Sequence, residues 1–226
     1  MANNTRITRN DPTSWETFDL RHLLPNHKEG ICLDLGCGPG IAQEMTSRGY
    51  QYIGLDRFPV TGADIQADAT ALPFADNHFD LIIAASSFEH FPDPWSAARE
   101  IARILKPGGY AVISLSFLEP YHARSYFHMS HLGAKKLFTD AGLTIEIIEP
   151  FEWSGIEASM QALVQLRFLR WLSGLLVKST LLVRRLAIKH LTGFLSEQGK
   201  RQRAMEFLAE EPFRFTAGIK VRACKK

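Results

Sequence analysis

Three glycines alternate in the segment GCGPG (36–40), directly after the strand-like run LDL (33–35). Glycine is needed where the backbone must take a positive φ or approach a ligand more closely than a Cβ permits. Because open α/β sheets bind ligands at the carboxyl ends of their strands, this loop predicts a cofactor cradle. The dinucleotide fingerprint G-x-G-x-x-G would need a glycine at position 41, which is Ile41, and no phosphate-binding G-K-[ST] follows. The spacing therefore disfavours a ligand bound through a pyrophosphate.

Three aspartates stand where strand ends should gather around this loop. Asp34 lies under the loop, where a positively charged amino acid moiety would be placed. Asp56 follows the glycines by about 20 residues, the position from which a carboxylate can accept two ribose hydroxyls. Asp68 comes after the next apolar run and could accept a hydrogen bond from an adenine amino group. Each alone could be an ordinary turn aspartate. Together they predict an adenosyl ligand that carries positive charge.

Short strand-like runs alternate with helix-compatible stretches around these residues, which predicts βαβ units and a parallel sheet buried on both faces. The expected helices are 40–48, 94–105, capped by Asp93, and 130–141. Pro107-Gly108-Gly109 predicts a sharp break before the fifth strand. The expected strands are 31–35, 52–55, 64–67, 80–84, 110–116, 144–149 and 215–223.

The composition predicts one enzyme-sized domain with an insertion. Of 226 residues, 46% are hydrophobic and 22% charged, which excludes disordered, collagen-like and disulfide-scaffold chains. Three cysteines without a CxxC pair suggest neither a zinc site nor a disulfide framework, and no metal site is expected. A polar N-terminus and the lack of a long uncharged apolar window argue against a signal peptide or a membrane span. A cytoplasmic location is expected.

The net charge of +2 conceals an asymmetry. Residues 1–150 carry 12 Lys and Arg against 18 Asp and Glu, hence −6, whereas residues 151–226 carry 14 against 6, hence +8. The stretch 158–196 has no acidic residue, and its basic residues recur on roughly one helical side: Arg167, Arg170, Lys178, Arg185 and Lys189. With its many leucines and valines, this pattern predicts a basic amphipathic helical insertion. Such an insertion could pack on the core or on a second subunit, or lie on an anionic membrane.

The order of five motifs resembles the class I S-adenosylmethionine-dependent methyltransferases, and more narrowly the type 11 methyltransferase family. The matching segments are DLGCGPG (34–40), YIGLD (52–56), ADATALPFADNHFDLI (67–82), FEHFPDPWSAAREIARILKPGG (88–109) and, more loosely, KKLFTDAGLTIEI (135–146). The resemblance implies a Rossmann-like α/β fold, a seven-stranded sheet with an antiparallel seventh strand and helices on both faces. Residues 1–150 and 212–226 would form the cofactor-binding core, and residues 151–211 the helical insertion.

The cofactor implied by the resemblance is S-adenosylmethionine, with S-adenosylhomocysteine as its product. The residues expected to hold it are those of the glycine loop and the neighbouring strand ends: Asp34, Gly36, Cys37, Gly38, Gly40, Asp56, Arg57, Asp68, Ala69, Ala85 and Ser86.

Transfer of the sulfonium methyl is an in-line displacement, so the chain must align a nucleophile and exclude water. For a hydroxyl acceptor, a base helps to remove the proton, and histidine suits that task near pH 7. His90 and His122, which follow the fourth and fifth strands, are the candidates, although structural roles remain open for both. Glu89 is expected to make local hydrogen bonds. Four aromatic residues could wall the acceptor pocket, or equally belong to the core: Trp15, Phe88, Tyr121 and Tyr126.

The acceptor is expected to be a small or amphiphilic molecule, with O-methylation favoured and a lipid, quinone or glycan precursor as candidate classes. The expected partners include an anionic membrane, contacted peripherally at its inner face through 158–196, and a second copy of the chain. Nucleic acid is not expected, because no interleaved aromatic and basic pattern is present. Two other functions stay open: a cofactor-binding assembly module without turnover, and a nicotinamide oxidoreductase.

Overall fold

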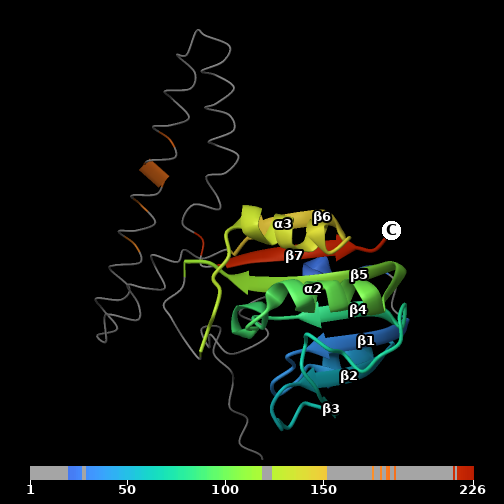
Figure 1. Ribbon diagram of the computed structural model, residues 1–226. Coiled ribbons are helices and arrows are strands. Elements are labelled where there is room, and N and C mark those ends of the chain that lie inside the picture. The colour runs from blue at the N-terminus through green and yellow to red at the C-terminus, as the bar shows by residue number, and fades with distance from the viewer. Residues whose placement is uncertain are drawn as a thin grey trace, which may run out of the picture.

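Seven strands form one mixed sheet in the order β3-β2-β1-β4-β5-β7-β6 (Figure 1). This computed structural model describes residues 20–26, 29–118, 124–151, 175, 179, 182–183, 186, 216 and 218–226. The strands are β1 Gly30–Leu35, β2 Tyr50–Asp56, β3 Ile65–Gln66, β4 Phe79–Ala84, β5 Leu105–Ser116, β6 Thr144–Pro150 and β7 Gly218–Cys224. Strands β1 to β5 pair in parallel, and β7 runs antiparallel to both β5 and β6. The expected seven-stranded arrangement with an antiparallel last strand is therefore confirmed.

Two of the described helices, α2 Pro94–Ile104 and α3 His131–Asp140, begin at a side chain that caps their first N–H groups. Helix α1 spans Ala42–Ser47, and the short 3-10 turns are η1 Arg21–Leu23 and η2 Phe88–His90. The Asp93 carboxylate accepts the N–H of Ser96 at 3.0 Å, and Pro94 occupies the first turn, where its missing N–H costs nothing. The Ser130 hydroxyl caps α3 in the same way by accepting the N–H of Gly133.

Alternating side chains of the strands enter two separate apolar clusters, one on each face of the sheet. Leu33 and Leu35 of β1 join the cluster that holds α2 and α3, whereas Cys32 points into the cluster with η1 and Met45 of α1. A period of two along a strand sends successive side chains to opposite faces. The sheet is thus buried on both sides, as the sequence predicts.

The break expected at Pro107-Gly108-Gly109 is a bulge inside β5, because β5 starts at Leu105. The register with β4 passes from Phe79 opposite Leu105 to Leu81 opposite Tyr110. The chain after β7 holds this bulge: Gly108 N–H donates to the Lys225 carbonyl at 2.7 Å, and Lys225 N–H donates to the Gly109 carbonyl at 3.2 Å. The partner lies more than a hundred residues away in sequence, so local pattern could not reveal it.

Most of the expected insertion at 151–211, and with it Arg167, Arg170, Lys178, Arg185 and Lys189, lies outside the described residues. The residues that are described there after Phe151 are helical and exposed: Leu175, Ser179, Leu182, Val183 and Leu186. Among the described residues, no helix has the length and apolar character needed to cross a bilayer.

Candidate functional site

The glycine loop 36–40 connects the end of β1 to the approach to α1 and is fixed to β2. Gly36, Gly38 and Gly40 have φ values of 74°, 52° and 79°, the left-handed region that favours glycine. The N–H groups of Gly36 and Cys37 both donate to the Leu55 carbonyl, at 2.8 and 3.1 Å. The loop therefore turns sharply at the carboxyl ends of β1 and β2.

Two of these glycines face different surroundings. A Cβ on Gly36 would lie 2.6 Å from Ser87 Oγ, so the loop packs tightly against the chain that follows β4. A Cβ on Gly38 would meet no atom within 4 Å. The loop is thus closed toward Ser87 and open at Gly38, which is the shape of a cradle that leaves backbone accessible to a ligand.

Two further glycines, which the sequence did not single out, allow close packing at this loop: Gly62 packs against the loop, and Gly54 packs against Gly62. A Cβ on Gly54 would lie 2.1 Å from the Gly62 carbonyl oxygen, and one on Gly62 would lie 2.4 Å from the Pro39 carbonyl carbon. Gly62 N–H also donates to the Gly38 carbonyl at 3.2 Å. Position 62 carries no local signal, because its need for glycine comes from a loop more than 20 residues away.

Asp56 gives the loop its shape as well as its charge. Its Oδ2 accepts the Gly38 N–H at 3.1 Å and its Oδ1 accepts the Phe58 N–H at 2.9 Å. An ionised carboxylate has about four acceptor sites. The same side chain can therefore hold the loop and accept further hydroxyl donors.

Asp34 is a buried acid, 4% exposed, at the end of β1. Tyr52 donates its hydroxyl proton to Asp34 Oδ2 at 2.8 Å, and the same hydroxyl accepts the Ile41 N–H at 3.3 Å. Burial raises the pKa of Asp34 to about 6 and nearby Asp56 adds to the rise, while the Tyr52 hydrogen bond opposes it. A cation bound here would favour the carboxylate over the acid. Tyr52 is a site residue that sequence reasoning missed, because a strand tyrosine gives no motif signal.

The expected adenine side contains Asp68 just beyond β3. Asp68 Oδ1 accepts the N–H and the hydroxyl of Thr70 at 2.9 and 2.8 Å, and these bonds lower the pKa of Asp68. Arg57 Nε lies 3.8 Å from Asp68 Oδ2. Ala69 is buried beside it. Asp68 is therefore an ionised acceptor at the same sheet edge as Asp56.

Cys37 has a different character from the acids of the loop. Burial raises the pKa of its thiol to about 12, and the negative charges of Asp34 and Asp56 add to the effect. Because the thiolate is the nucleophilic form of cysteine, Cys37 is a packing residue of the loop and no nucleophile.

The chain that leaves β4 meets the end of β5 through buried polar groups. Ser86 has a φ of 49°, and its N–H donates to Ser114 Oγ at 2.9 Å. Glu89, 1% exposed, accepts the Ser116 hydroxyl at 2.7 Å. The Glu89 carbonyl also accepts the N–H groups of Tyr126 and Phe127, at 2.6 and 3.3 Å. Glu89 thus joins β5 and the segment 124–130 over this end of the sheet.

Comparisons with known proteins agree with this geometry. Residues 33–113 match the family model described as "Methyltransferase domain". An uncharacterized methyltransferase of Mycobacterium sp. (strain KMS) is 35% identical over 116 residues, which cover 46% of this chain and 46% of that relative. The chain has the class I methyltransferase fold, and residues 33–113 are similar to that domain family. It spans less than half the length of the curated relatives that it matches.

Solved structures resemble this chain in fold at low sequence identity. An S-adenosylmethionine-dependent methyltransferase from Mesorhizobium loti has a TM-score of 0.55 and 18% identity, with 91% of this chain and 95% of that chain covered. The [4+2]-cyclase SpnF has a TM-score of 0.57 and 17% identity, with 91% and 78% covered. At these identities the likeness concerns the fold alone.

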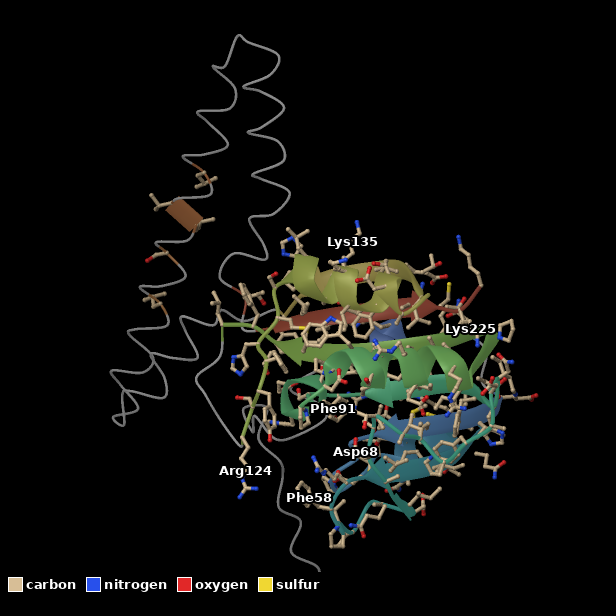
Figure 2. All side chains as sticks on the ribbon, viewed as in Figure 1. Phe58, Asp68, Phe91, Arg124, Lys135 and Lys225 are labelled. Carbon is tan, nitrogen blue, oxygen red and sulfur yellow. The ribbon has the colours of Figure 1, made fainter. Side chains whose placement is uncertain are left out.

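The remaining candidate residues are partly accessible, fully buried, or outside the described residues. His90 ends η2, half-buried, and Tyr126 is 59% exposed. Phe88 is fully buried and packs edge-on against Phe138 with ring centroids 5.3 Å apart, which favours a core role over the predicted pocket role. Figure 2 shows Phe58, Asp68, Phe91 and Arg124 toward one end of the sheet and Lys225 at the other. Trp15, Tyr121 and His122 lie outside the described residues.

Proposed function

We propose that this protein transfers a methyl group from S-adenosylmethionine to a small or amphiphilic acceptor and releases S-adenosylhomocysteine. The observation that carries the proposal is the glycine loop. Its backbone is open at Gly38, and Asp34 and Asp56 flank it at the ends of two adjacent strands. The cofactor supplies an activated methyl on a positively charged sulfur, which needs no covalent intermediate on the protein.

The residues of this chain divide the binding of that cofactor among themselves. The buried Asp34 would pair with the ammonium of the methionine portion, since a bound cation offsets the cost of ionising a buried acid. Asp56 would accept ribose hydroxyls on the acceptor sites that Gly38 and Phe58 leave unused. Asp68 and Ala69 would contact the adenine, with Arg57 beside them, and Ala85 and Ser86 would face the methionine portion.

The acceptor would enter beyond β4 and β5, where buried polar groups replace bulk water. A hydroxyl acceptor is favoured, with His90 or His122 removing its proton. Tyr126 and the residues Trp15 and Tyr121 would border the acceptor. Glu89 and Ser116 would act as positioning residues, because their hydrogen bond is buried and holds the segment 124–130 in place.

Calorimetry with S-adenosylmethionine and S-adenosylhomocysteine tests the cofactor site. We expect binding by the full chain and a loss of at least about tenfold in affinity for Asp56→Ala, or about 1.4 kcal/mol. Asp140→Asn is the matched control, because Asp140 is an exposed acid on α3 that pairs with Lys136. Equal affinities of the wild type and Asp56→Ala would contradict the proposed site, and binding of NADH instead would favour the oxidoreductase alternative.

Binding and turnover need separate measurements, since one fold neighbour of this chain is named as a cyclase. Radiolabelled methyl donor is incubated with the protein and a cell extract, and the methylated product is identified by mass. Transfer above that of Asp56→Ala supports the enzyme. Cofactor binding without transfer to any extract fraction favours the assembly-module alternative.

Replacement of the histidines separates catalysis from binding. If His90 is the base, His90→Gln should lower kcat by about 100-fold while the affinity for S-adenosylmethionine stays within about twofold of the wild type. The same measurement on His122→Gln assigns the role to one of the two.

A further inference from the structure

Four aliphatic side chains of the 175–186 region are exposed although they stand in helical conformation. Leu175, Leu182, Val183 and Leu186 expose 52%, 57%, 66% and 57% of their surface. Their spacings of 7, 1 and 3 residues bring them to the same side of a helix. The orange fragments of this region lie well apart from the sheet in Figure 1. We refer to these four residues as the exposed aliphatic face.

The sequence around this face is basic. Lys178, Arg185 and Lys189 each stand three positions after one of the exposed leucines, Leu175, Leu182 and Leu186 respectively. These three basic residues lie outside the described residues, so their pattern is one of sequence alone. No Asp or Glu occurs anywhere from 158 to 196. An apolar stripe with Lys and Arg beside it is typical of helices that lie in the headgroup region of anionic bilayers.

We propose that the exposed aliphatic face binds an anionic membrane surface and tethers the methyltransferase domain to it. The proposal is independent of the methyl-transfer reaction. The leucines and Val183 enter the boundary between headgroups and acyl chains, and the basic residues contact lipid phosphates. Residues 1–150, with a net charge of −6, are repelled by the same surface, so the cofactor-binding sheet stays in the water phase.

Charge argues against a second copy as the occupant of this face. A two-fold symmetric interface brings the same patch of each subunit together. Two copies of an acid-free stretch would then face each other with like charges, which opposes association. An anionic lipid surface offers both the apolar layer and the opposite charge.

Vesicle flotation of the full chain tests the proposal. Vesicles of phosphatidylcholine alone are compared with vesicles containing about 30% phosphatidylglycerol, at low and at high salt. We expect at least about tenfold tighter binding to the anionic vesicles and a marked loss at 0.5 M NaCl, because salt screens exposed charges. Binding that is equal on both vesicle types overturns the proposal.

Matched variants identify the binding face. Leu182→Gln with Leu186→Gln, and separately Lys178→Glu with Arg185→Glu and Lys189→Glu, should each weaken binding at least about tenfold. The controls are Leu132→Gln and Lys135→Glu on α3, since Leu132 is 58% exposed and both positions lie on the methyltransferase domain. Circular dichroism checks that every variant is folded. If the controls lose binding as much as the test variants, the exposed aliphatic face is not the membrane-binding surface.

The oligomeric state tests the alternative that a second copy of the chain covers the exposed aliphatic face. Light scattering of the wild type across protein concentrations should give the monomer mass in the absence of vesicles. A dimer that the Leu182→Gln, Leu186→Gln variant converts to a monomer would show that a second copy covers the exposed aliphatic face, and would overturn membrane binding there.

Discussion

The proposed cofactor side and the proposed acceptor side of this sheet edge are built in different ways. On the proposed cofactor side, backbone groups make most of the contacts: the left-handed Gly36 and Gly38 donate to Leu55 and Asp56 of the neighbouring strand. On the proposed acceptor side, side chains of β5 bond groups of the segment after β4: Ser114 accepts the Ser86 N–H, and Ser116 donates to the buried Glu89.

The family match falls mainly on the proposed cofactor side. The family match covers residues 33–113, which includes the whole glycine loop but ends before Ser114, Ser116 and the segment 124–130. A common cofactor requires a common backbone cradle, whereas the acceptor side can change through substitutions at scattered positions. The part of the proposed acceptor side that follows residue 113 therefore lies outside the family match.

The largest effect should come from Gly36→Ala. Its Cβ would lie 2.6 Å from Ser87 Oγ and 2.8 Å from Ser87 Cβ at a φ of 74°, so we expect a loss of about 3 kcal/mol in unfolding free energy. Gly38→Ala has a similar φ but an open surrounding, and should cost only about 1 kcal/mol. Urea unfolding measures both.

The same pair of variants separates structure from binding. The methyl group of Gly38→Ala projects into the open side of the cradle, so this variant should lose at least about tenfold in S-adenosylmethionine affinity despite its stability. If Gly38→Ala binds as well as the wild type, the open side of the loop is not the cofactor side.

On the proposed acceptor side, Glu89→Ala should lower the unfolding free energy by about 2–3 kcal/mol, because it removes a buried hydrogen bond and leaves a void. A double-mutant cycle with Ser116→Ala should give a coupling of about 1–2 kcal/mol. The exposed pair Lys136 and Asp140 on α3 is the control cycle, with an expected coupling of about 0.3–0.5 kcal/mol. Equal couplings in the two cycles would show that the buried hydrogen bond is no stronger than the surface ion pair.

The sequence predicts those features whose contacts are local and misses those whose contacts join residues far apart in the chain. The strands, the Asp93 cap and the Asp34–Asp56 pair follow from local pattern, since each signal lies within a short window or at a strand end. Gly62, Tyr52 and the bulge at Gly108 could not be predicted, because their constraints come from Pro39, Asp34 and Lys225, which local pattern does not connect to them. Burial of Phe88 against Phe138 is a long-range contact of the same kind.

Asp34→Asn should raise stability and weaken binding at once. The pKa of Asp34 in the folded chain is about 6, above its usual value near 3.8, so the folded state holds this proton more tightly than the unfolded chain does. The stability that this provides is complete below pH 4 and is lost as the pH rises through 6. At pH 7.5, Asn, which cannot ionise, should therefore stabilise the fold by about 2–3 kcal/mol relative to Asp.

The pH dependence of this stability difference is the control. The difference in unfolding free energy between Asp34→Asn and the wild type should shrink as the pH falls from 6 to below 4, because Asp34 then becomes protonated in the unfolded chain as well as in the folded one. Asn still accepts the Tyr52 hydroxyl but carries no charge, so we expect at least about tenfold weaker S-adenosylmethionine binding at pH 7.5. A stability difference that does not depend on pH would disprove ionisation of Asp34 as its cause.

The smallest effect is the pH dependence of cofactor affinity in the wild type. If the ammonium of the cofactor pairs with ionised Asp34, protonation of Asp34 should weaken binding below pH 6, by about tenfold at pH 5. Calorimetry at pH 7.5, 6 and 5 measures the change, and proton uptake or release in buffers of different ionisation enthalpy reports whether Asp34 loses its proton on binding. Asp34→Asn should show a flat profile over the same range. A profile in Asp34→Asn as steep as that of the wild type would place the titrating group elsewhere, and the cofactor side would then owe its affinity to the backbone cradle and Asp56 without a contribution from the buried charge.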